Sequence, residues 1–393
     1  MESVYWSGRL RRLSPYIPGE QPRDRQFIKL NTNENPYPPS PRVFEAINRA
    51  AGETIRLYPD PSCLELRETI AARYGVKPSQ VFAGNGSDEI LAFAFAAFFP
   101  GASAPAGTIA LGTTATAGTA APTGTMSATG TLSTTDATEI LFPDITYSFY
   151  PVYADLWAVP CKTVPLDGDF VIHPEDYRIP NGGIIFPNPN APTGRVLDTA
   201  AILSLAEWQE RQGRVLIVDE AYIAFGGRTL IPHISTHPNL LLIHTLSKSA
   251  SLAGLRVGFA VAQEELIEGL CRVRDSFNSY TLDRLAQAAA AAAVADAPYY
   301  EGLARRIIAT RARVTVELEN RGITVIPSLA NFLFIRFPGL SGAAAAAALR
   351  EQGILVRHFN RDRIADFLRV SIGTDEEMDM FLQECKKIVG VCL

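Results

Sequence analysis

The sequence predicts an α/β protein with a large, doubly wound, mostly parallel sheet and a second, smaller α+β domain. Apolar runs typical of buried strands, such as 215–218 and 241–243, alternate with stretches of helical spacing. Polar residues follow these runs directly, and the carboxyl ends of parallel strands meet at one edge of a sheet, where ligands bind. With 393 residues the chain is long enough for about two domains.

Three regions are expected along the chain. Residues 1–44 are rich in proline and polar groups, and we expect an extended arm that joins the small domain. Residues 45–275 should form the large domain and residues 276–393 the small one. Residues 101–140 are almost wholly Ala, Thr, Gly and Ser, which we interpret as a low-complexity insert, since long connections are uncommon in compact domains.

Hydrophobic spacing and turn residues place the elements of the two domains. In the large domain we expect helices at 41–51, 64–74, 90–99, 147–153 and 199–212, and strands at 81–83, 170–172, 183–186, 215–218 and 241–243. Helices should dominate from 264 to 321, followed by strands at 331–335, 354–357 and 367–371 and a closing helix at 375–389.

Composition excludes several classes of function. The net charge of −5 argues against a nucleic-acid or membrane partner. The five cysteines show no paired spacing, which favours reduced thiols in the cytoplasm over a disulfide frame, and we expect no metal site. Residues 1–12 have no apolar run of signal-peptide type, and no apolar stretch is long enough to span a bilayer.

A lysine and an arginine in residues 245–258 suggest the chemistry. Lys248 lies between two serines after the strand at 241–243, and Arg256 follows in a glycine-rich stretch. A lysine does covalent chemistry when its site lowers its pKa and holds it against a carbonyl, while arginine binds phosphate bidentately. A carbonyl and a phosphate on one molecule suggest pyridoxal phosphate, although a surface lysine is the commoner explanation of such a stretch taken alone.

The turn at 84–89 follows a strand and precedes a helix, an arrangement that binds phosphate. Ser87 and Asp88 lie in this turn, where free backbone N–H groups and the positive end of the helix dipole face an anion. A tight turn with an N-cap is the alternative.

Three further side chains suit a pyridine ring. Asp219 follows the strand at 215–218, and a carboxylate against a pyridinium nitrogen keeps that nitrogen protonated. Tyr222 can reach a ring hydroxyl, and Tyr147 can stack on the ring face. A helix N-cap and two structural tyrosines would be the simpler explanation of each residue alone.

Together these motifs resemble the fold-type I pyridoxal-phosphate aminotransferases and, within them, the histidinol-phosphate aminotransferase family. The superfamily motifs are Asp-Glu-Ala-Tyr at 219–222, Thr-Leu-Ser-Lys at 245–248, Leu-Ala-Gly-Leu-Arg at 252–256 and Pro-Thr-Gly at 192–194. The narrower resemblance rests on the stretches 14–16, 30–34, 56–59, 84–89, 146–150 and 368–374.

The resemblance implies a role for each site residue. Lys248 would bond covalently to the cofactor and move the substrate's proton, Asp219 would pair with the ring nitrogen and Tyr222 would bind the ring oxygen. The other cofactor contacts that it implies are Ser87, Asp88, Ser247 and Arg256 at the phosphate, Tyr147 on the ring, Asn190 near the ring oxygen, and Tyr58 from a second subunit. Substrate contacts are implied for Tyr16 and Arg357 at a phosphate and for Arg369 at a carboxylate.

The implied function is amino transfer between L-histidinol phosphate and 2-oxoglutarate in histidine biosynthesis, by a cytoplasmic homodimer acting on small molecules. An aromatic amino-acid aminotransferase or a phosphothreonine decarboxylase-like lyase could use the same motifs, and an inactive binding protein is the alternative of another class. One residue departs from the superfamily pattern. Ala191 stands where asparagine usually donates to the ring oxygen, so Asn190, a water or Tyr222 alone must serve there.

Overall fold

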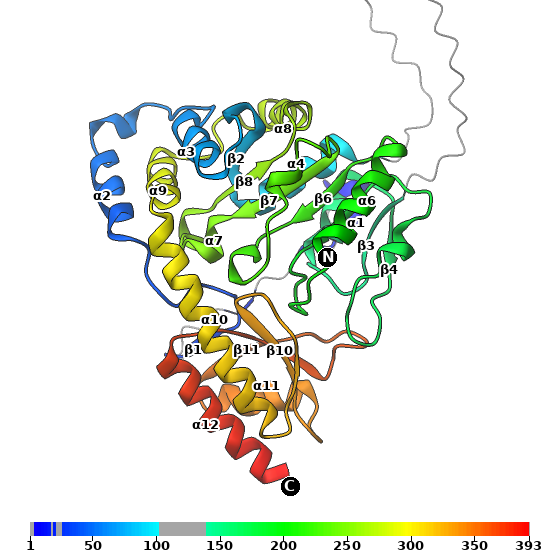
Figure 1. The fold of residues 1–393 in the computed structure, drawn as a ribbon, viewed down its shortest axis with the longest axis vertical. Coiled ribbons are helices and arrows are strands. Elements are labelled where there is room, and N and C mark those ends of the chain that lie inside the picture. Colours follow the sequence, from blue (N-terminus) through cyan, green and yellow to red (C-terminus); the bar gives the residue numbers. More distant parts are fainter. Residues whose placement is uncertain (1–3, 17–18, 21–25, 102–138, 393) are drawn as a thin grey trace, which may run out of the picture.

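The structure, a computed structural model, describes residues 4–16, 19–20, 26–101 and 139–392. Two sheets lie one above the other in Figure 1, and the long helix α10 (Ala297–Glu319) runs beside both. It packs against the segment Ile223–Phe225 of the upper part and against the strands and the last helix of the lower part. The predicted insert at 101–140 lies almost entirely outside the described residues.

The upper sheet has seven strands in the order β2-β8-β7-β6-β5-β3-β4. Only β8 runs antiparallel to its neighbours, so the predicted doubly wound, mostly parallel fold is confirmed. Its strands are β2 Val81–Asn85, β3 Ile140–Pro143, β4 Cys161–Val164, β5 Ile184–Pro187, β6 Leu216–Asp219, β7 Leu240–Thr245 and β8 Val257–Val261.

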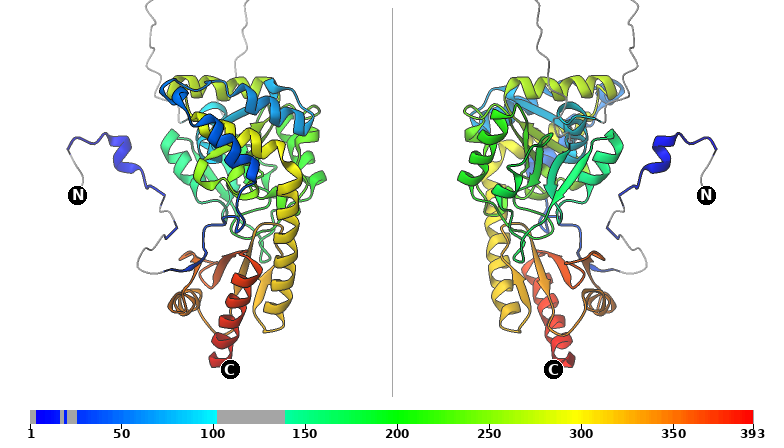
Figure 2. Two further views of the ribbon diagram at one scale, coloured as in Figure 1. Left: turned by 90° about the vertical axis from the view of Figure 1, so that its left-hand side faces the viewer. Right: turned by 90° about the vertical axis from the view of Figure 1, so that its right-hand side faces the viewer.

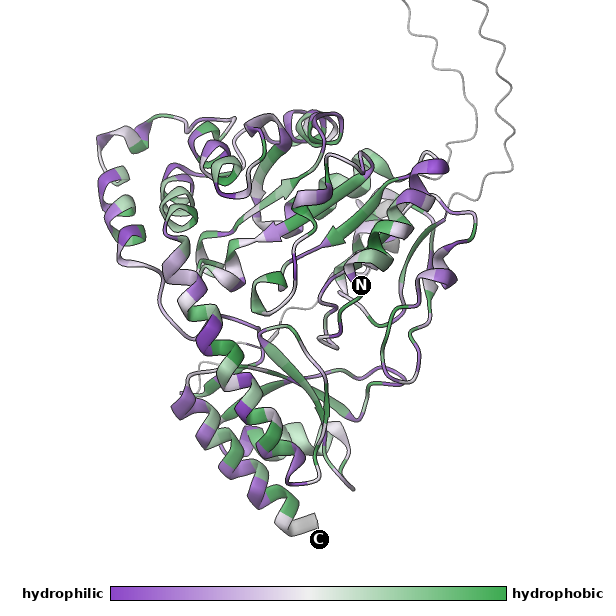
Figure 3. Ribbon diagram, in the orientation of Figure 1, coloured by the Kyte–Doolittle hydropathy of each residue, from purple (hydrophilic) through white to green (hydrophobic). Residues whose placement is uncertain are grey.

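Helices cover both faces of this sheet, because alternate residues of each strand point to opposite sides. Leu216 and Val218 pack in one apolar cluster with α6 and α9, whereas Ile217 packs in another with α4, α5 and α8. The helices of this part are α2 Pro41–Ala50, α3 Leu64–Tyr74, α4 Gly86–Phe98, α5 Phe149–Trp157, α6 Thr199–Arg211, α7 Leu246–Ser249, α8 Glu264–Phe277 and α9 Arg284–Ala295. Figure 3 shows the strands of this sheet as mostly hydrophobic.

The lower sheet has five strands in the order β1-β11-β12-β10-β9. The N-terminal strand β1 pairs in parallel with β11, which ties the beginning of the chain to its last third. The strands are β1 Ile28–Leu30, β9 Thr324–Ile326, β10 Phe332–Arg336, β11 Ile354–His358 and β12 Phe367–Ser371, and the helices beside them are α11 Gly342–Glu351 and α12 Asp375–Cys392. Short 3-10 turns complete the described chain: Glu53–Arg56, Pro78–Gln80, Pro174–Tyr177, Ile223–Phe225, Ile231–His233 and Ala253–Leu255.

Two expectations about local structure were wrong. The predicted strand at 170–172 is irregular, because Asp167 Oδ1 accepts the backbone N–H groups of Asp169 and Val171 and turns the chain there. The edge strand in this region is β4 instead. The arm is also not free of regular structure, since it contains β1 and the short helix α1 (Gly8–Arg12), which stands away from the rest in Figure 2.

The division of the chain at residue 275 stays a prediction. Helix α8 crosses that position, and α9 packs on α2 and α3 of the upper part. Among the described helices, none has both the length and the hydropathy to cross a membrane.

Candidate active site

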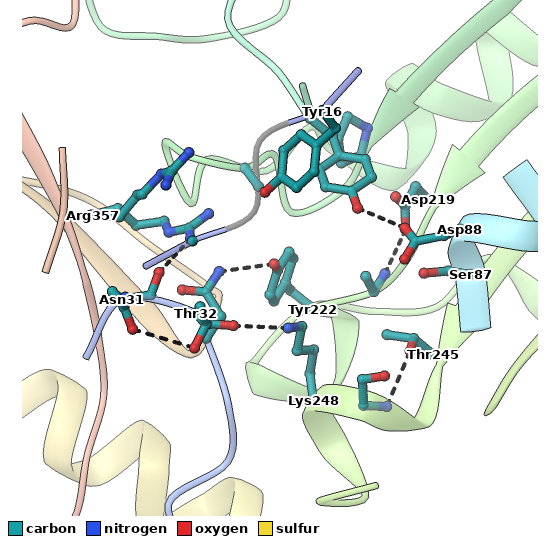
Figure 4. A pocket seen from close by; sticks show the side chains of 18 of the residues that line it. Tyr16, Asn31, Thr32, Ser87, Asp88, Asp219, Tyr222, Thr245, Lys248 and Arg357 are labelled. Carbon is teal, nitrogen blue, oxygen red and sulfur yellow. Dashed lines mark hydrogen bonds between the residues drawn. The ribbon is translucent and has the colours of Figure 1, made fainter. Parts of the chain in front are cut away.

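A cavity of about 150 Å³ opens between the two sheets, at the carboxyl ends of β6 and β7 (Figure 4). Eleven of the predicted site residues line it, and they come from seven stretches of the chain. They are Tyr16, Ser87, Asp88, Tyr147, Asp219, Tyr222, Ser247, Lys248, Arg256, Arg357 and Arg369.

One wall of the cavity is an anion cradle at the beginning of α4. Arg256, which has a positive φ of 53°, turns its guanidinium to Asp88, with Nη2 to Oδ2 at 2.8 Å, and lies 3.5 Å from Ser247 Oγ. Gly86 is required here, because a Cβ would lie 2.6 Å from Arg256 Nη2. A Cβ on Gly258 would likewise lie 2.5 Å from the backbone nitrogen of Ser87. Glycine at both positions thus lets Arg256 and strand β8 lie close to the beginning of α4, and a guanidinium beside a helix N-terminus suits a phosphate.

Lys248 lies in α7, which begins where Thr245 Oγ1 accepts the N–H of Ser247. Its ammonium donates to the carbonyl of Thr32 at 3.1 Å (Figure 4). The backbone carbonyl of Lys248 accepts from Asn35 Nδ2. Burial, helped by the charge of Arg369, lowers the pKa of Lys248 to about 8. Much of this amine is therefore neutral near pH 8 and can act as a nucleophile or a base.

Asp219 ends β6 with its carboxylate almost fully buried. Burial raises its pKa to about 7, against the opposing hydrogen bond from the backbone N–H of Ala221. The Tyr150 hydroxyl is its other donor, at a long 3.4 Å. Among the described residues it forms no ion pair, so a protonated nitrogen would suit it.

Two tyrosines line the space between Lys248 and the cradle. Tyr147 donates from its hydroxyl to Asp88 Oδ1 at 2.7 Å, and its ring lies near that of Phe149. Tyr222 packs edge-on against Phe332 and accepts a hydrogen bond from Asn33 Nδ2 at 2.9 Å. Burial raises the pKa of Tyr222, although the charge of Arg369 opposes this.

The end of the cavity toward the lower sheet carries two arginines. Arg369 donates to the carbonyl of Asn31, but its buried Nε has no hydrogen-bond partner among the described residues. Arg357 lies on the neighbouring strand, directly opposite Arg369. Tyr16 stacks on Phe149 with the ring centres 4.2 Å apart and borders the same space. Two cations that face a cavity suit an anionic substrate.

Two predicted site residues do not line the cavity. Asn190 is buried beside it, where its amide donates to the Ile145 carbonyl and to Thr193. Tyr58 is 78% exposed and stacks on Tyr280. The hypothesis that Asn190 replaces the missing amide donor therefore has no contact to support it.

Sequence reasoning missed two groups of residues. The segment 31–33 lines the cavity, although the sequence indicated no role for it in the site beyond its place in an extended arm and in the family resemblance. Its cluster of asparagines was a usable signal, because buried amides usually serve a specific hydrogen bond. Tyr150, which supports Asp219, gave no signal beyond its aromatic neighbours.

Comparisons with known proteins agree with this geometry. The family model described as aminotransferase class I and II matches residues 25–104 and 113–384. The histidinol-phosphate aminotransferase of Clostridium acetobutylicum is 48% identical over 388 residues, which cover 99% of this chain and 100% of that relative. Histidinol-phosphate aminotransferase 2 of Thiobacillus denitrificans is also 48% identical, over 98% of both chains.

Solved structures agree with the fold. The histidinol-phosphate aminotransferase of Sinorhizobium meliloti, in complex with pyridoxal-5'-phosphate, superposes with a TM-score of 0.79 at 20% identity and covers 100% of this chain and 99% of that one. Aspartate aminotransferase of Thermus thermophilus with maleate gives a TM-score of 0.76 at 18% identity, over 99% and 100% of the two chains. At these identities the likeness concerns the fold alone.

Proposed function

Because this chain belongs to the class I and II aminotransferases and, within them, to the histidinol-phosphate aminotransferases, we propose that it transfers the amino group of L-histidinol phosphate to 2-oxoglutarate. The products would be imidazole-acetol phosphate and L-glutamate, in histidine biosynthesis. One observation carries the proposal: a single cavity joins a lysine of lowered pKa, a buried carboxylate without an ion pair among the described residues, and a cradle for phosphate.

The residues of the cavity fit pyridoxal phosphate. Ser87, Ser247 and Arg256 would hold its phosphate beside the N-terminus of α4. When bound, the cofactor supplies an electron sink for the bond that breaks at the substrate's Cα. Asp219 would keep the ring nitrogen protonated, because a carboxylate whose pKa is raised by burial is stabilised by a cation.

Tyrosine and lysine side chains would orient the ring and move the proton. Tyr147 borders the cavity with its ring held by the bond to Asp88, and it would stack on the pyridine. Tyr222 would donate to the ring oxygen. Lys248, with a pKa of about 8, can take a proton from the substrate's Cα and deliver it at the end of the transfer, and the Thr32 carbonyl orients its nitrogen.

The two arginines would divide the substrate's anionic groups. Arg369, with a buried and unpartnered Nε, would bind the carboxylate of 2-oxoglutarate and of glutamate. Arg357 and Tyr16, at the open side, would take the phosphate of L-histidinol phosphate. This arrangement explains how one site could accept two substrates of different shape.

We further propose a cytoplasmic homodimer, in which Tyr58 completes the site of the other subunit. Support comes from exposed large apolar side chains close to Tyr58 in the chain, at Ile55, Leu57 and Leu64, and from its exposed ring partner Tyr280. Patches of this kind mark protein interfaces. Mixing Lys248→Ala with Tyr58→Ala subunits would test it, since each mixed dimer would regain one complete site and hence activity. Mixtures that stay inactive would count against shared sites.

An absorbance spectrum tests the proposed reaction most directly. Protein loaded with pyridoxal phosphate should show a visible band that L-histidinol phosphate abolishes and that 2-oxoglutarate restores. A response to phenylalanine or tyrosine but not to histidinol phosphate would favour an aromatic aminotransferase. Release of carbon dioxide without a keto acid would favour the lyase, and folded protein without any band would contradict the proposal.

A further inference from the structure

Residue 191 leaves one contact of the proposed cofactor without its usual donor. The Ala191 methyl lines the cavity where an amide would be expected. The neighbouring Asn190 cannot replace it, because its Nδ2 donates to the Ile145 carbonyl at 2.9 Å and to Thr193 Oγ1 at 3.1 Å, while its Oδ1 accepts from Thr146. Tyr222 therefore remains as the donor beside the cavity, and among the described residues its hydroxyl has one hydrogen-bond partner, Asn33.

Asn33 is buried, and every polar group that it carries is bonded. Its backbone N–H donates to Ser371 Oγ at 2.8 Å, and its carbonyl accepts from Asn331 Nδ2 at 2.9 Å. Its side chain accepts from Ser371 Oγ at 3.1 Å and donates to the Tyr222 hydroxyl at 2.9 Å. Three of these four hydrogen bonds join Asn33 to Ser371 of β12 and to Asn331, which precedes β10 of the lower sheet. The fourth joins Asn33 to Tyr222 beside the cavity.

This network fixes the direction of the Asn33 amide. The buried Ser371 hydroxyl donates its proton to Asn33 Oδ1 and has no other acceptor among the described residues, so a flipped amide would leave this proton without a partner. The amide nitrogen therefore faces Tyr222. A hydroxyl has one proton to donate and lone pairs to accept with, and the Tyr222 oxygen already accepts from Asn33. Its proton is thereby directed away from Asn33 and into the cavity.

We propose that Asn33 is a positioning residue for the cofactor's ring oxygen: it fixes the Tyr222 hydroxyl as a donor into the cavity and so compensates for the amide that Ala191 lacks. The inference rests on the proposed function. It also links the lower sheet to the cofactor, because Ser371 and Asn331 hold Asn33 in place.

The variants follow from the backbone at this position. Residue 33 has a φ of +55°, where alanine would be strained and glycine is not. Asn33→Gly therefore removes the amide with the least disturbance, and Asn33→Asp keeps the shape but cannot donate to Tyr222. Asn239→Gly is the matched control, since the Asn239 amide donates to the carbonyls of Ala206 and Arg214, outside the cavity.

The readout is the pH midpoint of the colour change of protein loaded with pyridoxal phosphate. A hydrogen bond donated to the ring oxygen stabilises its anion and lowers this midpoint. We expect Asn33→Gly and Asn33→Asp to raise it by about 0.5 to 1 unit, the equivalent of one net hydrogen bond. Asn239→Gly should leave it unchanged.

Repeating the Asn33→Gly substitution in a Tyr222→Phe variant separates an effect that passes through the Tyr222 hydroxyl from a general loosening of the site. Tyr222→Phe should raise the midpoint by itself, and Asn33→Gly should then add nothing, because its effect passes through the hydroxyl. An equal shift in both backgrounds, or none in either, would overturn the inference while leaving the proposed function intact. Absence of a visible band in the unaltered protein would overturn the proposed function instead.

Discussion

Two cavities lie on opposite sides of the short helix α7, and neighbouring residues of the same segments line them. Asp219, Ser247 and Lys248 face the candidate active site. Glu220 and Ser249 face a second cavity of about 230 Å³ that also contains His244. The two adjacent carboxylates, Asp219 and Glu220, are both almost fully buried, yet their surroundings differ.

The difference lies in the partners of each carboxylate. Glu220 accepts from the Thr229 hydroxyl and from the backbone N–H of Leu230, and His244 Nε2 lies 3.0 Å from it. Asp219 has one backbone donor and one long contact from Tyr150. A buried charge that the protein satisfies by itself serves the fold, whereas one left short of partners is suited to a ligand.

Lys248→Ala should have the largest effect, because it removes the nucleophile and the base together. We expect kcat to fall by about 10³-fold or more, with loss of the visible band. Ser249→Ala is the control, since it changes the other side of the same helix and should keep kcat within about twofold. Near-normal turnover by the Lys248 variant would refute the assignment.

Substitutions of the two carboxylates should separate their roles. Asp219→Asn should lower kcat by about 10²- to 10³-fold, because a neutral amide does not hold the ring nitrogen protonated. Glu220→Gln should leave kcat nearly unchanged but reduce the free energy of unfolding by about 1–3 kcal/mol, since it disturbs a buried hydrogen-bond network. Measurements of kcat and of urea unfolding for both variants test this difference. A large loss of kcat in Glu220→Gln but not in Asp219→Asn would show that the two roles are assigned the wrong way round.

In cofactor-free protein, the titration of Asp219 should make the free energy of unfolding depend on pH. Its folded pKa of about 7 lies above that of the unfolded chain, so the folded state holds a proton that the unfolded state has lost. This contribution is complete below the unfolded pKa and disappears as the pH rises through about 7. The loss amounts to at most about 1.4 kcal/mol per pH unit.

Melting temperatures from pH 5 to 8 measure this effect. Cofactor-free wild-type protein should lose stability relative to Asp219→Asn as the pH rises. Pyridoxal phosphate should reduce the difference, because a protonated ring nitrogen would pair with the carboxylate. A difference that does not change with pH would show that Asp219 is charged throughout.

Tyr150→Phe should have the smallest effect, since its hydroxyl lies a long 3.4 Å from Asp219 Oδ2. We expect kcat to fall by about fivefold or less, corresponding to about 1 kcal/mol or less. Tyr153→Phe is the matched control, because the Tyr153 hydroxyl has no hydrogen-bond partner among the described residues, and kcat should not change. Equal losses in both variants would point to packing and not to the hydroxyl.

The sequence by itself determined four strands of the upper sheet, β2, β5, β6 and β7, and the residues at their ends. The apolar runs before Asp219 and Lys248 appear as β6 and β7, and Ser87 and Asp88, which were expected in the turn before a helix, lie in the first turn of α4. These features are local, because a buried strand needs a continuous apolar run and its polar successor then lies at the sheet edge.

Only the tertiary structure decided which distant residues complete the site. Nothing in the local sequence shows that Asn33 reaches Tyr222, a contact across 189 positions, or that Thr32 meets Lys248 across 216. The same holds for Asp219 and Glu220, which are adjacent acids with identical local signals. Their roles differ because strand alternation turns them toward different cavities. There, other segments supply several hydrogen-bond partners to Glu220 and few to Asp219.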